Sequence, residues 1–406
     1  MKLKVASQKE VAPSIAFDGA KVKAPSYGRY LEDFREGDVY VHPRGLTIHG
    51  GLAQLFATSF HEANPIYLNR EFAKAMGHPE SPASPQLVFN IVLSLGVQND
   101  SEKAIANLGY YDARFVRPVY PHDTLRALTK VLNVKERGEG KPGIVTIRTI
   151  GLNQKDELVL QYDRKIMVGP GGGKKREEST SGSPTIALGF PELRENAIEI
   201  PAPNRPPRNL TGAHTWFEDF KAGDVILHAN GRTITDEHVA WTYRVGNTHP
   251  LHYDRDYSRA QKGAMSGEPI VYGGLAFAWL QGLASRDTTE NAVCELGFTE
   301  GYHTQPVVSG DTLHAITRIL SAEKVGAAAA KSGPADLKAM SATATADASI
   351  DAGVVTMQLV GLKNVRPADA LEKHGAALFA KELSKEQKIP EKVFEIERQV
   401  LVRTRG

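Results

Sequence analysis

A segment rich in side chains that can hold or move a proton lies in the second half of the chain. It reads Val245-Gly-Asn-Thr-His-Pro-Leu-His-Tyr-Asp254, which places Asn247, His249 and His252 close together. Histidine titrates near neutral pH, so a histidine held on a loop can pass a proton between a water molecule and a substrate carbon. The alternative is a loop whose polar groups only hydrogen-bond one another. We expect no metal here, because no cysteine or third ligand stands at a spacing typical of zinc sites.

A second motif, Tyr272-Gly273-Gly274, stands at the predicted start of an apolar helix. The first N–H groups of a helix lack partners within the helix, and glycine places no Cβ in front of them. Such a helix start can hold a carbonyl oxygen that gains negative charge during a reaction. Glycine at a helix start can also simply permit a tight turn. We take Tyr272, Gly273 and Gly274 as candidate thioester-binding residues.

The elements that must position these residues occur twice in the chain. Three pairs of segments match at a nearly constant separation of about 186 residues, as internal duplication requires. The pairs are Tyr30–His42 with Trp216–His228, Asn64–Asn69 with His249–Asp254, and Pro118–Leu125 with Pro306–Leu313. Farther on the separation grows in two steps, which predicts two insertions in the second copy.

This repeat divides the chain into four parts. We expect an N-terminal arm over 1–25, a first unit over 26–168, a linker over 169–210 and a second unit over 211–406. The linker is rich in Gly, Ser and Lys, a composition that cannot bury enough surface to order itself. The insertions in the second unit are expected near 322–346 and 366–390.

Each copy has the same predicted order of elements. A short amphipathic helix, Gly50–Glu62 or Thr235–Val245 with Thr235 as N-cap, precedes the loop that carries the Asn-Pro or His-Pro dipeptide. A second helix, apolar nearly all round and therefore buried, follows as Pro85–Leu95 or Gly273–Leu283. The predicted strands are Gly143–Leu152, Leu158–Val168, Val354–Leu362 and Val393–Val402. The order predicts an α+β fold in which a sheet wraps around one central helix in each copy.

The two copies differ at the positions where chemistry is expected. Asn247, His249 and His252 of the second copy match Glu62, Asn64 and Tyr67 of the first, and the Gly273 position holds Pro85. Proline has no N–H to donate. The second copy is therefore the better candidate for the active half.

At these residues the sequence resembles the MaoC-like, R-specific enoyl-CoA hydratase family of hot-dog folds. That family carries Gly-Asp-x-Asn-Pro-Leu-His-x-Asp and then His-Gly at the start of the central helix, and Gly246–Asp254 and Tyr272-Gly273 occupy those places. The resemblance covers most of Tyr27–Val168 and Trp216–Val402. It implies a double hot-dog, two tandem units each with an antiparallel sheet around a central helix.

The resemblance also implies a reaction, the addition of water to a double bond conjugated with a coenzyme A thioester. The Gly273 N–H would hold the thioester oxygen while His252 moves protons. No separate cofactor is expected, because coenzyme A is part of the acyl-CoA substrate. A free carboxylate on the acyl group would need a cation, for which Arg244 and Arg255 are candidates, since arginine can bind a carboxylate through two hydrogen bonds. The alternatives are a general R-specific enoyl-CoA hydratase and a non-catalytic acyl-CoA-binding module.

The sequence departs from the family pattern at one catalytic position. The family uses an Asp and a His to bind and activate water, whereas this chain has Asn247 at the Asp position. An amide can orient water but cannot serve as a general base. Two hypotheses follow: a composite site that joins Glu62 to His252, or a pair formed by His249 and His252.

Composition excludes several other classes of protein. The 406 residues carry 49 basic and 47 acidic side chains, a net charge of +2, so no bulk field attracts nucleic acid. Neither a signal peptide nor a run of about 20 apolar residues is present, so no membrane association is expected. The single cysteine, Cys294, cannot form an intrachain disulfide. We expect a cytoplasmic homo-oligomer, with a dimer as the favoured state.

Overall fold

The structure is a computed structural model that describes residues 26–171, 190–193, 198–201, 206–261, 267–325, 351–382 and 386–406. The predicted N-terminal arm over 1–25 lies outside the described residues. So do most of the predicted linker and most of the insertion near 322–346, whose first residues belong to a strand instead.

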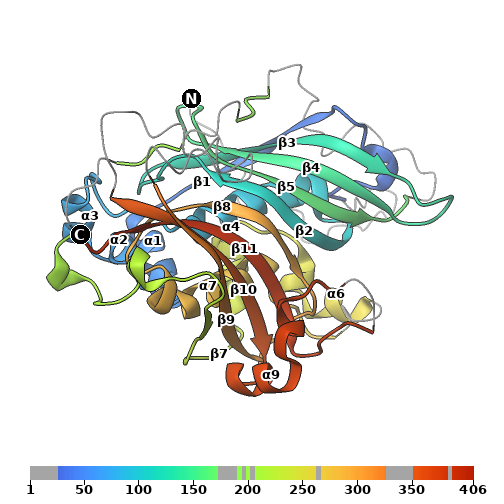
Figure 1. Ribbon diagram of the computed structural model, residues 1–406. Coiled ribbons are helices and arrows are strands. Elements are labelled where there is room, and N and C mark those ends of the chain that lie inside the picture. Colours follow the sequence, from blue (N-terminus) through green and yellow to red (C-terminus); the bar gives the residue numbers. More distant parts are fainter. Residues whose placement is uncertain are drawn as a thin grey trace, which may run out of the picture.

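One antiparallel sheet contains all the strands of the described part of the chain (Figure 1). Its order is β1-β3-β4-β5-β2-β8-β11-β10-β9-β6, and β7 also pairs with β9. The strands of the first copy are β1 Val39–Thr47, β2 Ala104–Phe115, β3 Thr124–Lys135, β4 Gly143–Leu152 and β5 Leu158–Val168. Those of the second are β6 Val225–Leu227, β7 Arg232–Thr233, β8 Ala292–His303, β9 Thr312–Lys324, β10 Ala352–Lys363 and β11 Lys392–Arg403. The copies join edge to edge where β2 pairs with β8.

The predicted strands are observed. β4 and β5 have the predicted bounds, and β10 and β11 extend slightly beyond theirs. The C-terminal strand β11 lies inside the part of the sheet formed by the second copy, between β8 and β10. The first residues of β4 alternate between buried and partly exposed, as expected of a strand with one face on the core.

Two central helices lie against the sheet, α4 Pro85–Gly96 and α7 Gly273–Thr288. α4 packs on β3, α7 packs on β9, and the two helices contact each other. α7 runs beyond its predicted end at Leu283. There Ser285 and Thr288 donate their hydroxyl hydrogens to helix carbonyls, at 2.8 and 2.6 Å, so these polar side chains need no water inside the core.

The shorter helices carry the loops of interest. They are α1 Gly50–Ser59, α2 Pro65–Leu68, α3 Arg70–Ala75, α5 Glu237–Arg244, α6 Arg255–Ala260 and α9 Pro367–His374, with the short turns η3 Leu31–Asp33, η4 Val97–Ser101, η5 Arg208–Leu210, η6 Phe217–Asp219, η7 Pro250–His252 and η10 Gly375–Phe379. α1 ends before the predicted Glu62 because His61 adopts a left-handed conformation with φ of 59°. α5 has Asp236, not Thr235, in the N-cap position. α9 and η10 lie within the predicted insertion near 366–390.

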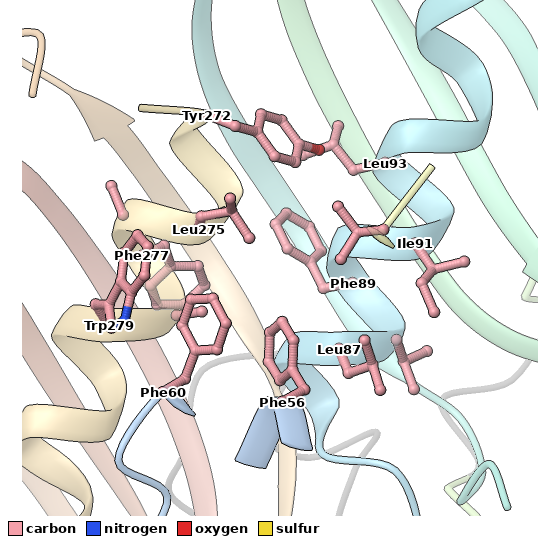
Figure 2. Packing of buried hydrophobic residues seen from close by; sticks show 14 of the residues in the cluster. Phe56, Phe60, Leu87, Phe89, Ile91, Leu93, Tyr272, Leu275, Phe277 and Trp279 are labelled. Carbon is pink, nitrogen blue, oxygen red and sulfur yellow. The ribbon is translucent and has the colours of Figure 1, made fainter. Parts of the chain in front are cut away.

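Aromatic packing fixes the first copy against the second (Figure 2). Phe60 stacks between Phe56 and Trp279, with ring centroids 4.1 and 4.5 Å away. Gly282 of α7 is needed at this contact, because a Cβ there would collide with the Phe60 carbonyl. The loop that follows α1 is therefore held against the C-terminal half of α7.

Within the described residues, no helix is both long and apolar enough to cross a membrane.

Candidate active site

The loop after α5 is built from interlocking side-chain caps. Gly246 adopts φ of 83°, and Asn247 Oδ1 accepts the His249 N–H at 2.8 Å. His249 Nδ1 in turn accepts the Leu251 N–H at 3.2 Å. The first copy repeats the pattern, since Glu62 Oε1 accepts the Asn64 N–H and Asn64 Oδ1 accepts the Ile66 N–H, both at 3.0 Å. Asn247 and His249 therefore each use one side-chain atom to stabilise the loop.

Among the described residues, only one of the two ring nitrogens of His252 makes a hydrogen bond. Its Nδ1 lies 3.0 Å from the Ile270 carbonyl oxygen, and because a carbonyl can only accept, Nδ1 carries the proton. The other nitrogen, Nε2, is then an acceptor that can take a proton. Burial, and after it the charge of the nearby His249, lowers the pKa of His252 to about 3. The imidazole is neutral in the folded protein near pH 7.

His249 is tied at both ends of its ring. Nδ1 accepts the Leu251 N–H, and a hydrogen bond to the Ala104 backbone acts to raise its pKa. Burial outweighs that bond and lowers the pKa of His249 to about 4. The His249 and His252 ring centroids are 5.5 Å apart. His249 Nδ1 thus caps the loop, which leaves that nitrogen unable to take a proton without losing the cap.

Asn247 keeps one unpaired donor. The residue is 2% exposed, and its Nδ2 is buried without a hydrogen-bond partner among the described residues. An unsatisfied buried donor costs about 1–3 kcal/mol. A water molecule or a substrate oxygen would remove that penalty, which suits Asn247 to orienting water.

The start of α7 leaves two backbone donors open. The Leu275 and Ala276 amides both donate to the Tyr272 carbonyl, at 2.9 and 3.1 Å. In the described part of the chain the Gly273 and Gly274 amides donate to no acceptor. The Tyr272 ring lies 5.3 Å from the His252 ring, between centroids, so the free amides and the free imidazole nitrogen share one region.

Neighbouring side chains leave little room for a Cβ atom at Gly273 or Gly274. A Cβ on Gly273 would lie 2.5 Å from His303 Nε2, and one on Gly274 would collide with the side chain of Asn90. Asn90 is buried in α4 and donates from Nδ2 to the Gly274 carbonyl at 3.1 Å. The central helix of the first copy therefore supports the helix start of the second.

Sequence reasoning missed two residues at this helix start, His303 and Tyr110. The Tyr110 hydroxyl lies 3.4 Å from His303 Nε2, and burial lowers the pKa of His303 to about 4. The sequence could have indicated His303, because the matching position of the first copy, at the same separation as the matched segments, holds Phe115 instead of a histidine. No such signal marked Tyr110, since only the pairing of β2 with β8 brings it here.

The composite hypothesis is not supported by the geometry. The amide next to Glu62 donates to the Ser285 hydroxyl at 3.0 Å, near the C-terminal end of α7. His252 contacts Tyr272 at the other end, and a rise of 1.5 Å per residue separates Tyr272 from Ser285 by about 20 Å. The structure therefore does not bring Glu62 and His252 together.

The two arginines expected to bind a substrate carboxylate, Arg244 and Arg255, are both exposed. Arg255 is exposed and donates from Nε to Glu268 at 2.6 Å. Arg244 is also exposed, and its guanidinium lies 4.9 Å from the centre of the Trp241 ring. Both interactions are those of surface side chains, so the described contacts do not support a clamp at Arg244 or Arg255. Spacing along the sequence placed them near the loop but could not give the direction of their side chains.

Histidines gather here without forming a metal site. His252 is influenced electrostatically by His249, His238 and His303. No set of three or more His, Cys, Asp or Glu side chains in the described ranges is arranged to hold a metal ion.

We predict that Glu62→Gln retains kcat within about twofold. Glutamine keeps the Oε1 atom that accepts the loop amides, and Glu62 lies about 20 Å from Tyr272 by the helix rise. Steady-state hydration assays on purified enzyme check this. A drop of tenfold or more, with an unchanged melting temperature, would return the composite site to consideration.

We also predict that kcat/KM shows no titration near pH 6.5. The base form of His252 is the neutral imidazole, and a pKa lowered to about 3 keeps it neutral throughout pH 6–8. An exposed histidine would instead lose activity as the pH fell through its ordinary value. A pH–rate profile over pH 6–8 at constant ionic strength measures this, and an acid limb centred near 6.5 would contradict the prediction.

The fold and this site define a class of protein, the MaoC-like double hot-dog proteins. A crystal structure of a MaoC domain protein dehydratase from Chloroflexus aurantiacus matches with a TM-score of 0.72 and 27% identity, over 95% of this chain and 100% of that one. A Mycobacterium tuberculosis protein described as a double hotdog fold matches with a TM-score of 0.63 and 20% identity, over 92% of this chain and 98% of that one.

The family model for mesaconyl-CoA hydratase matches residues 14–356, and the chain belongs to this family. The resemblance of the chain to these hydratases is confirmed over the matched residues, which include the Tyr30-Leu-Glu-Asp-Phe opening. The β-methylmalyl-CoA dehydratase of Chloroflexus aurantiacus is 32% identical over 72% of this chain and 82% of its own length. The mesaconyl-CoA hydratase of Cereibacter sphaeroides is 33% identical over 72% of this chain and 83% of its own length.

Proposed function

We propose that this protein catalyses the reversible hydration of mesaconyl-CoA (2-methylfumaryl-CoA) to β-methylmalyl-CoA. The observation that carries the proposal is the contact of the His252 ring, whose Nε2 makes no hydrogen bond among the described residues, with Tyr272 at the helix start that leaves the Gly273 and Gly274 amides unpaired. An acid–base group beside an oxyanion site is what addition of water to a conjugated thioester requires. Membership of the mesaconyl-CoA hydratase family supports the choice of acyl group.

The mechanism follows from the parts of the site. Asn247 Nδ2 orients a water molecule, and His252 Nε2 accepts a proton from it as the new C–O bond forms at the double bond. Electrons move toward the thioester oxygen, where the Gly273 N–H stabilises the developing enolate. The protonated His252 then returns its proton to the α-carbon as the enolate collapses. One water is added and no proton is gained or lost.

A spectrophotometric assay tests this proposal. Hydration removes the conjugated double bond, so the thioester's characteristic absorbance falls as the reaction proceeds. We expect turnover with mesaconyl-CoA and much slower turnover with crotonyl-CoA. Equal rates would support the general R-specific enoyl-CoA hydratase, and no change with either compound would support the binding module.

We further propose a cytoplasmic location and a homodimer of double hot-dogs. The balanced charge of the chain and its single cysteine support the location. Light scattering after size-exclusion chromatography distinguishes a dimer of the 44.2 kDa chain from a monomer. Fractionation of the source cells tests the location.

A further inference from the structure

An irregular stretch interrupts the pairing of β1 and contains one arginine, Arg44. Val41 pairs with Leu128 and Gly45 with Arg126, so β1 carries more residues than β3 between these pairs. Pro43 stands inside this bulge, where a missing N–H costs no ladder hydrogen bond. Bulges commonly lie beside active sites and redirect a side chain, and Arg44 lies within this bulge.

The end of β1 lies against the active loop of the other copy. Leu46 Cδ1 is 3.5 Å from the point where a Cβ on Gly246 would lie. Burial raises the pKa of Glu102, and its Thr248 hydrogen bond and then the charge of Arg44 oppose that rise. The charge of Arg44 likewise opposes the raised pKa of Tyr253, for which burial is again the main cause. Arg44 thus lies within electrostatic range of both sides of the loop.

Two guanidinium nitrogens of Arg44 lack a hydrogen-bond acceptor among the described residues. Its Nε and Nη2 atoms are buried and have no hydrogen-bond partner in the part of the chain that the structure describes. Burying a guanidinium without a partner is costly, because its charge loses water and gains no acceptor. The nearby Glu102 carboxylate accepts the Thr248 hydroxyl at 3.1 Å and forms no hydrogen bond with these two nitrogens of Arg44. The unpaired donors of Arg44 therefore call for an acceptor that the described part of the chain does not supply.

Arg164, a buried arginine whose charge reaches Tyr272, already has protein partners. Arg164 donates from Nη2 to Asp100 at 3.2 Å and to Ser101 at 3.1 Å. Its counterpart in the second copy, Arg398, pairs in the same way with a buried carboxylate, that of Glu295. An arginine pair present in both copies is best explained by the fold. Arg44 differs, because the matching position of the second copy holds Asn230, between β6 and β7.

We propose that Arg44 binds an anionic oxygen group of the acyl-CoA, either the free carboxylate of the acyl part or a phosphate of coenzyme A. The inference rests on the proposed function, because that function places an acyl-CoA beside the His252 loop. It assigns to the first copy, which lacks the catalytic groups, a role in choosing the substrate. A guanidinium can meet carboxylate and phosphate alike with two parallel hydrogen bonds.

Binding measurements with saturated thioesters test the proposal without requiring turnover. Methylsuccinyl-CoA carries both the carboxylate and the phosphates, whereas 2-methylbutyryl-CoA keeps the branched chain and the phosphates alone. We expect Arg44→Met to raise the Kd of methylsuccinyl-CoA by about 10–100-fold, as loss of a charge-assisted pair does. Arg255→Met, at an exposed arginine paired with Glu268, is the matched control and should leave both Kd values unchanged.

Each outcome decides one point. Weakened binding of methylsuccinyl-CoA alone identifies the carboxylate, and equal weakening of both ligands identifies a phosphate. Unchanged Kd values for both ligands, in an Arg44→Met protein with the wild-type melting temperature, overturn the proposal. Arg44→Lys should recover part of the affinity if charge matters, which a merely structural defect would not show. A wild-type enzyme that binds these thioesters but does not hydrate mesaconyl-CoA would overturn the proposed function and leave the result for Arg44 readable.

Discussion

Replacing His252 with alanine is expected to lower kcat for hydration by about 10²–10⁴-fold, the usual contribution of a general acid–base group. The reason is geometric, because His252 is the histidine of the loop that fixes its tautomer through a backbone carbonyl and keeps Nε2 free. KM should change little, since the proposed thioester-binding groups are backbone amides that this substitution leaves in place. Steady-state assays with mesaconyl-CoA give both constants.

The chain supplies its own control for this experiment. The first copy has Asn64 where the second has His249, and Asn64 caps its loop by the same kind of hydrogen bond. His249→Asn should therefore keep the loop folded and retain kcat within about tenfold. If His249→Asn lost as much activity as His252→Ala while melting normally, the two histidines would act as a catalytic pair. If His252→Ala were fully active, another group would be the base.

The duplication made most of the fold predictable. Matched segments at one separation predicted two equivalent units, and periodic apolar residues predicted α4, α7, β4 and β5 with nearly correct bounds. The ends of elements were less predictable where polar residues decide them. Ser285 and Thr288 look like the end of a helix in sequence, yet their hydroxyl groups bond to helix carbonyls and the helix continues.

The site was predictable only where its residues are neighbours in sequence. Asn247, His249 and His252 lie on one loop, and the difference between Gly273 and Pro85 distinguishes the two helix starts. Tyr110 comes from the other copy through strand pairing, which no local pattern encodes.

The two copies act as one unit at this site. The second supplies the loop and the helix start, and the first supplies surrounding groups that fix them. The Ala104 backbone holds His249, the Glu102 carboxylate accepts from Thr248, and Asn90 bonds the Gly274 carbonyl. The first copy is therefore part of the candidate site, because Asn90 of α4, Glu102 and the start of β2 all reach the loop or the helix start of the second copy.

Replacing Gly273 with proline is expected to lower kcat by about 10²–10³-fold relative to Gly273→Ala, the cost of one oxyanion donor. Both variants add a Cβ, which would lie 2.5 Å from His303 Nε2, so both displace His303 to a similar degree. Only proline also removes the N–H. The ratio of their kcat values therefore isolates the hydrogen bond from the steric effect.

Proline fits this backbone without unfolding the helix. The first position of a helix tolerates proline because its N–H has no partner within the helix, and α4 begins in this way at Pro85. The residue before proline must be extended, and Tyr272 already has φ of −57° and ψ of 128°, close to the −61° and 146° of Ser84 before Pro85. Melting temperatures of the two variants should agree. Equal kcat values for the alanine and proline variants would mean that the Gly273 amide does not stabilise the enolate, and the neighbouring Gly274 amide would then be the donor to test.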